Sequence, residues 1–158
     1  MEFNKNIVVL GCGFAGLEVV KELRKFLGNS VDITVVDKKD HFTYNPLLFS
    51  YFAGHTKESD VILRYNDLFK GLNINFLQDR VTSIKSKIKT VNLENTTLKY
   101  DYLVIALGSE VKYNHLPRVD NKLFLFNSLN SVKALENHIK TIFESLKKEK
   151  KLGIHKKK

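Results

Sequence analysis

Three glycines near the N-terminus have the spacing of a loop that binds phosphate. Gly11, Gly13 and Gly16 form the pattern G-C-G-F-A-G, after a short apolar run and before a segment with helical periodicity. In this arrangement the first glycine permits a tight turn. The second lets a diphosphate approach the backbone, and the third lets the helix pack closely on the strand. The helix N-terminus then offers N–H groups and a positive dipole end to the phosphates. The pattern therefore predicts a dinucleotide site.

An acidic residue follows at the distance that such a site requires. Asp37 lies twenty-one residues after Gly16, where a carboxylate accepts hydrogen bonds from ribose hydroxyls. Its charge disfavours a ligand with a 2′-phosphate, although Lys38 and Lys39 weaken that argument. Because NAD and FAD share an ADP half, these residues leave both ligands open. Two other interpretations remain: a glycine-rich turn without a ligand, and Asp37 as a simple backbone cap.

Two strands and a helix must position these residues. Asn6–Leu10 and Val31–Val36 are short, β-branched apolar runs, which favours buried strands over helices. The segment between them, Phe14–Leu27, has apolar residues at helical spacing and ends at Gly28. The three elements make a βαβ unit, whose crossover should be right-handed.

The rest of the chain predicts an α/β domain with a small antiparallel insertion. A second continuous apolar run, Tyr102–Leu107, ends at Gly108 and reads as another buried strand. Ser131–Leu146 has the apolar stripe of an amphipathic helix, with Ser128, Asn130 or Ser131 as its cap. The predicted fold is a Rossmann-like parallel sheet with flanking helices. Its other expected elements are a loop and short helix over residues 41–54, helical turns over 65–70, and strands over 72–77, 80–85, 87–93 and 96–99.

Composition excludes several classes of protein. The 158 residues are 43% hydrophobic, which is enough for a core and argues against intrinsic disorder. No run of 18 apolar residues occurs, so no transmembrane helix is expected. The N-terminus does not resemble a signal peptide, and a cytoplasmic location is expected. Cys12 is the single cysteine, which excludes an intrachain disulfide, and the histidines lack metal-ligand spacing.

Most of the net charge of +9 comes from the C-terminal end. Residues Lys147–Lys158 include seven lysines and one glutamate. Such a tail can bind nucleic acid or anionic lipid, but these lysines are not interleaved with arginine or aromatic residues. We therefore expect a domain over residues 1–146, a disordered tail over 147–158, and no nucleic-acid partner.

Three further segments resemble a known family of flavoproteins. They are Asp37-Lys38 with His41–Phe49, Tyr100–Ser109, and Asn114–Pro117 with Leu129–Ile139. In this order they resemble the N-terminal, FAD-binding part of type II NADH dehydrogenases (NADH:quinone oxidoreductases), members of the pyridine nucleotide-disulfide oxidoreductase superfamily. Sulfide:quinone oxidoreductases are the second resemblance, disfavoured because the catalytic cysteines of that group have no counterparts here. The resemblance implies FAD as the cofactor.

The resemblance also implies which residues contact FAD. The glycine loop and Asp37 would hold the ADP half, the segment ending in Pro-Leu-Leu would line the flavin side, and the backbone at Val81 would meet the adenine. Leu107 departs from the threonine that is common at its position. The implied cofactor-binding residues are Gly11, Gly13, Phe14, Ala15, Gly16, Asp37, Lys38, Pro46, Leu47, Val81, Ala106 and Gly108, with Tyr44 and Asn45 less firmly assigned.

The resemblance covers only the first part of such an enzyme. No second G-x-G-x-x-G occurs, so a site for NADH is expected on a complementing chain, which could also bring the protein to a membrane surface. No catalytic residue is assigned, and the sequence leaves open whether this chain alone is an enzyme. The alternatives are a stand-alone NAD-binding module and an inactive remnant.

Overall fold

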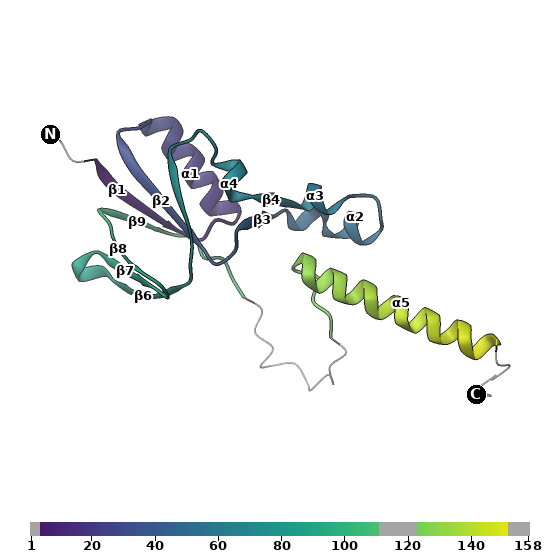
Figure 1. The fold of residues 1–158 in the computed structure, drawn as a ribbon. Helices are drawn as coiled ribbons and strands as arrows, with labels where there is room; N and C mark the ends of the chain where they lie inside the picture. Colours follow the sequence, from purple (N-terminus) through teal and green to yellow (C-terminus); the bar gives the residue numbers. More distant parts are fainter. Residues whose placement is uncertain (1–3, 111–122, 152–158) are drawn as a thin grey trace. The chain divides into compact units, whose positions relative to one another are not determined.

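The computed structural model describes residues 4–110 and 123–151. The chain forms two compact units (Figure 1). The first contains Met1–Phe42 and Ile62–Lys112, and the second contains Thr43–Val61 and Tyr113–Lys158. The segment Asn114–Pro117, which contributes to the resemblance, and the end of the lysine-rich tail lie outside the described residues.

A four-stranded parallel sheet is the centre of the first unit. Its strands have the order β5-β2-β1-β9, and helix α1 (Phe14–Leu27) connects β1 to β2. The parallel register pairs Leu10 with both Val36 and Ile105. The predicted α/β, Rossmann-like fold is therefore confirmed. The strands are β1 (Lys5–Leu10), β2 (Val31–Asp37), β5 (Ile74–Gln78) and β9 (Tyr102–Ile105).

Because the strands are parallel, their carboxyl ends lie along one edge of the sheet. Asp37 pairs with Gln78 at this edge, and Ala106 donates its N–H to the Leu10 carbonyl at 2.7 Å. Open α/β sheets bind ligands beyond this edge. The fold therefore brings together the glycine loop, Asp37 and the segments that follow β5 and β9.

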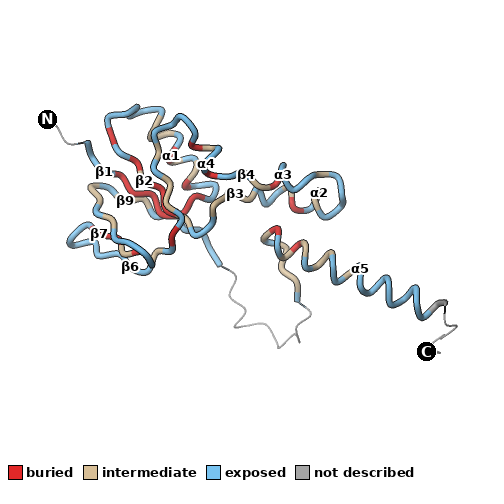
Figure 2. Tube along the Cα trace, viewed as in Figure 1, coloured by how far each residue is buried: buried red, intermediate tan, exposed pale blue. Residues whose placement is uncertain are grey.

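Both faces of the sheet are covered by apolar side chains. Alternate residues of β1 point to opposite faces: Ile7 and Val9 pack with Val20 of α1, whereas Val8 and Leu10 pack with Val91. Figure 2 shows the buried residues concentrated along β1 and β2. Each fully buried valine contributes about 1.5–3 kcal/mol, which explains the continuous apolar runs. The second face is covered by an antiparallel sheet of β6 (Val81–Lys85), β7 (Thr90–Leu93) and β8 (Thr97–Lys99), with η2 (Ser86–Ile88) between β6 and β7.

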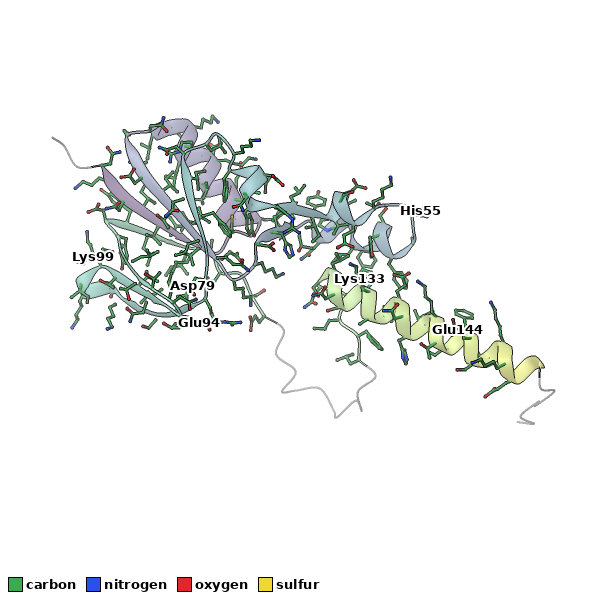
Figure 3. All side chains as sticks on the ribbon, in the orientation of Figure 1. His55, Asp79, Glu94, Lys99, Lys133 and Glu144 are labelled. Atoms are coloured by element: carbon green, nitrogen blue, oxygen red, sulfur yellow. The ribbon has the colours of Figure 1, made fainter. Side chains whose placement is uncertain are left out.

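The remaining elements are short, apart from the last helix. The side chain of Lys133 in α5 (labelled in Figure 3) lies 2.6 Å from Glu58 in α3, and Phe49 of α2 stacks on Phe126. Strands β3 and β4 form a separate two-stranded sheet. These elements are β3 (His41–Thr43), η1 (Asn45–Leu47), α2 (Leu48–Phe52), α3 (Glu58–Val61), β4 (Ile62–Arg64), α4 (Tyr65–Leu68) and α5 (Leu129–Lys151).

Helix α5 is longer than the sequence pattern predicted. The Ser128 hydroxyl accepts the N–H of Ser131, so Ser128 provides the predicted cap. At the other end the helix continues past Leu146 to Lys151, where a disordered tail was expected. Lysine and glutamate are good helix formers, so the helix persists after its apolar stripe has ended.

Candidate functional site

Two of the three loop glycines are required by the fold itself. Gly11 has φ +87°, and a Cβ at this position would collide with the carbonyl oxygen of Ala106. A Cβ at Gly16 would collide with the carbonyl oxygen of Gly11. These contacts agree with the tight turn and the close helix packing that the spacing predicted.

Gly13 has no such packing requirement. A Cβ built at Gly13 meets no atom of the described structure within 4 Å, and its φ of −71° is open to any residue. Gly13 is also the N-cap of α1, and no side chain of the described residues caps that helix end. The free space beside Gly13, at the positive end of a helix dipole, fits an anionic diphosphate.

The carboxylate of Asp37 faces the glycine loop. One oxygen accepts the N–H of Cys12 at 2.7 Å, and the other accepts the N–H of Lys39 at 2.9 Å. Asp37 therefore caps the backbone at Cys12 and Lys39, and its contact with a ribose stays a prediction. A carboxylate has about four lone-pair positions, so both oxygens can still accept hydrogen bonds from ribose hydroxyls.

The other predicted residues of the glycine loop are exposed at the start of α1. Phe14 is 53% exposed, and its ring meets Phe42 edge-on with 4.8 Å between centroids. Ala15 is exposed. Lys38 is exposed too, and its ammonium lies 2.7 Å from the carboxylate of Glu110. This ammonium lowers the pKa of Glu110. Because the Lys38 charge is paired with Glu110, Lys38 should attract a 2′-phosphate less strongly than the sequence suggested.

The segments that follow β9 and β5 lie at the same carboxyl-terminal edge of the parallel sheet. Ala106 lies against the glycine loop, and Gly108 has φ +74°. Val81 begins β6 and packs against the apolar cluster that contains Leu10 and Val91. The backbone N–H of Asp79 donates to the Asp37 carbonyl at 3.0 Å, which places the turn before Val81 beside the acid.

The sequence pattern did not identify two buried polar residues of this region. Asp79 (labelled in Figure 3) is 6% exposed, and its carboxylate accepts N–H groups of Arg80 and Asn95. Tyr65 is 2% exposed and donates its hydroxyl to the Cys12 carbonyl at 2.7 Å. Its partner is 53 residues away, so no local signal could have found this contact.

Burial opposes ionisation of the Cys12 thiol. Burial, assisted by the Asp37 charge, raises the pKa of the Cys12 thiol from 9.0 to about 12. The thiolate is the reactive form, so its population at neutral pH is very small. The side chain instead fills the core beside Val9 and Tyr65.

Pro46 and Leu47 belong to the second unit. Both lie in η1, and the Leu47 N–H donates to the Tyr44 carbonyl at 3.0 Å. Pro46 is exposed, Leu47 is half-buried, and the following Leu48 is fully buried. Of Pro46, Leu47, Leu48 and Phe49, only Leu48 belongs to the buried core. The positions of Pro46 and Leu47 in a cofactor site stay a prediction.

The described part of the chain contains neither a cluster of metal-ligating side chains nor a membrane-spanning helix. No group of three or more metal-ligating side chains occurs there. No helix in residues 4–110 or 123–151 is long and apolar enough to cross a membrane.

Nearly the whole chain matches a known protein family. The profile of the pyridine nucleotide-disulphide oxidoreductase family matches residues 5–152. The chain belongs to this family. Among its relatives in the family, type II NADH:quinone oxidoreductases of Staphylococcus haemolyticus and Staphylococcus aureus are 29% and 28% identical over 140 residues. The resemblance predicted from the sequence is therefore confirmed.

Solved structures of related oxidoreductases share the fold. NDH2 from Plasmodium falciparum, in complex with NADH, superposes with a TM-score of 0.80 over 92% of this chain and 30% of its own, at 22% identity. The sulfide:quinone oxidoreductase of Aquifex aeolicus gives 0.79 over 89% and 32%, also at 22%. This pyridine nucleotide-disulphide oxidoreductase chain spans about a third of the curated relatives, since each match covers 88% of it and 35% of the relative.

Proposed function

We propose that this chain is the FAD-binding domain of an oxidoreductase similar to type II NADH:quinone oxidoreductase. One observation carries the proposal. Of the three loop glycines, Gly11 and Gly16 are required by internal packing, whereas Gly13 borders free space at a helix N-terminus. A glycine that the fold does not need is explained by a ligand that approaches the backbone there.

The residues of the edge fit the ADP half of FAD. The start of α1 would bind the diphosphate, and Asp37 would accept hydrogen bonds from the ribose. The turn at Asp79, tied to the Asp37 carbonyl, would bring the Val81 backbone to the adenine. Ala106 and Gly108 would close the site from β9. The proposed role of Pro46 and Leu47, which belong to the second unit, rests on the family resemblance alone.

FAD supplies two-electron redox chemistry when it is bound, and the role of this chain would be to bind and orient it. By analogy with the names of its relatives, NADH would be the electron donor and a quinone the acceptor. Hydride transfer needs a nicotinamide held against the flavin, and the one fingerprint of this sequence is already used for FAD. We therefore propose that NADH binds to a polypeptide region other than this glycine loop.

The same edge would suit NAD in a stand-alone module, because Asp37 and the loop recognise the part that NAD shares with FAD. Calorimetric titration of the purified chain with FAD, ADP and NAD separates the two functions. Tighter binding of FAD than of NAD supports the flavoprotein. Tighter binding of NAD would support a stand-alone NAD-binding module. A folded chain that binds none of the three ligands would be an inactive remnant.

A further inference from the structure

The residue after Gly11 is held at both of its backbone polar groups. The Cys12 N–H donates to Asp37 at 2.7 Å, and the Cys12 carbonyl accepts the Tyr65 hydroxyl at 2.7 Å. Asp37 ends β2 and Tyr65 begins α4. Cys12 is itself fully buried, so Tyr65 satisfies a carbonyl group that has little access to water.

This second hydrogen bond fixes the direction of the next N–H. The Cys12–Gly13 peptide bond is trans, and in a planar trans peptide the C=O and N–H groups point in opposite directions. Because the Cys12 carbonyl points to Tyr65, the Gly13 N–H points away from it. Gly13 is the N-cap of α1, and a Cβ at this position would meet open space. We therefore expect the N–H that is turned away from Tyr65 to be available to a diphosphate at this helix end.

A flipped peptide would have the opposite effect. It would turn the Cys12 oxygen away from Tyr65 and toward the side that should receive an anion, where its partial negative charge repels phosphate. Glycine at position 13 gives the backbone freedom for such a flip. The loop therefore needs a constraint on this peptide, and the Tyr65 hydroxyl supplies one.

We propose that Tyr65 is a positioning residue that holds the Cys12–Gly13 peptide with its N–H available to the diphosphate of the cofactor. The inference rests on the proposed function, because it concerns the same site. Tyr65 does not touch the ligand but acts through the backbone of Cys12.

The surroundings of Tyr65 keep its hydroxyl in place. Its ring lies 4.9 Å from Phe76 and 5.9 Å from Phe69, centroid to centroid. Its backbone N–H donates to the Asp40 carbonyl at 3.1 Å. Burial, followed by the charge of Asp37, raises the pKa of the hydroxyl, so it remains a proton donor over the physiological pH range.

The test compares Tyr65→Phe with Phe69→Leu in the full chain. The first removes only the hydroxyl, whereas the second disturbs the same aromatic cluster and leaves the hydroxyl bond intact. Calorimetry with FAD and ADP should give about tenfold weaker binding for Tyr65→Phe, the scale of one lost hydrogen bond. For Phe69→Leu we expect a change within about twofold. Equal losses in both variants, or unchanged binding in Tyr65→Phe, would overturn the proposal.

NMR provides a readout that does not depend on FAD binding. In the free protein, Tyr65→Phe should move the Cys12 carbonyl carbon resonance upfield and perturb the Gly13 amide, whereas Phe69→Leu should leave both in place. Added ADP should shift the Gly13 amide in the wild type and less in Tyr65→Phe. If the wild type binds neither FAD nor ADP, the proposed function fails. Unchanged Cys12 and Gly13 signals in free Tyr65→Phe would contradict the positioning role itself.

Discussion

The carboxylate of Asp37 accepts the backbone N–H of Cys12 at 2.7 Å. This contact joins the end of β2 to the glycine loop, because Asp37 is the last residue of that strand. The acid thus shapes the phosphate loop as well as facing the expected position of the ribose. If the proposed ribose contact forms, the same side chain has two roles.

Asp37→Ala should therefore weaken FAD binding strongly. The change removes an acceptor from the loop and from the ribose, and hydrogen bonds to a charged group contribute about 1.5–3 kcal/mol. We expect a loss of about ten- to a hundredfold in FAD affinity, measured by calorimetry. Asp32→Ala is the matched control, because Asp32 is an exposed acid on the same strand. Equal affinities of the two variants would contradict the role of Asp37.

Gly13→Val should abolish binding without unfolding the protein. The backbone at Gly13 has an ordinary φ, and its neighbourhood is open, so the thermal unfolding midpoint should stay close to that of the wild type. The added side chain would occupy the space proposed for the diphosphate. FAD affinity should fall at least about a hundredfold, the effect of blocking close backbone approach. Retained affinity would show that the diphosphate binds elsewhere.

Gly16→Ala, in contrast, should lower the stability of the fold. In an ordinary helix this substitution stabilises by about 1 kcal/mol. Here the new Cβ would collide with the Gly11 carbonyl, and overpacking of this kind costs about 1–3 kcal/mol. Urea unfolding should therefore show a net loss of stability. A gain in stability would mean that the loop and helix are less closely packed than the structure indicates.

Stability should decrease in alkaline solution because of Cys12. Burial raises the pKa of its thiol from 9.0 to about 12, so the folded state holds this proton more tightly than the unfolded state. That stabilisation is complete below pH 9 and is lost as the pH rises toward 12. Urea unfolding between pH 8 and pH 11 should show a shallower decrease for Cys12→Ala than for the wild type. Identical pH dependence would contradict the burial of the thiol.

The central sheet and the glycine loop could be predicted because their signals are local. Continuous β-branched runs at Asn6–Leu10 and Val31–Val36 identify buried parallel strands, and β1 and β2 differ from these bounds by one residue at one end. The spacing of Gly11, Gly13 and Gly16 indicates a turn, a free backbone and a close helix contact, and the geometry agrees at each position.

Long-range contacts could not be predicted in this way. Tyr65 is part of a short segment with no distinctive pattern, and only the fold brings its hydroxyl to Cys12. Asp79 looks like an ordinary turn residue in the sequence but is buried with three hydrogen bonds. The end of α5 was predicted too early because apolar periodicity stops at Leu146, whereas helix propensity continues through the lysines.

The visible absorption spectrum tests the central claim most directly. The purified chain would be incubated with FAD, separated from free cofactor by gel filtration, and recorded beside Gly13→Val. We predict a two-band flavin spectrum near stoichiometric occupancy for the wild type and a colourless variant of equal thermal stability. A folded wild-type protein that remains colourless would contradict the assignment of this edge of the sheet to FAD.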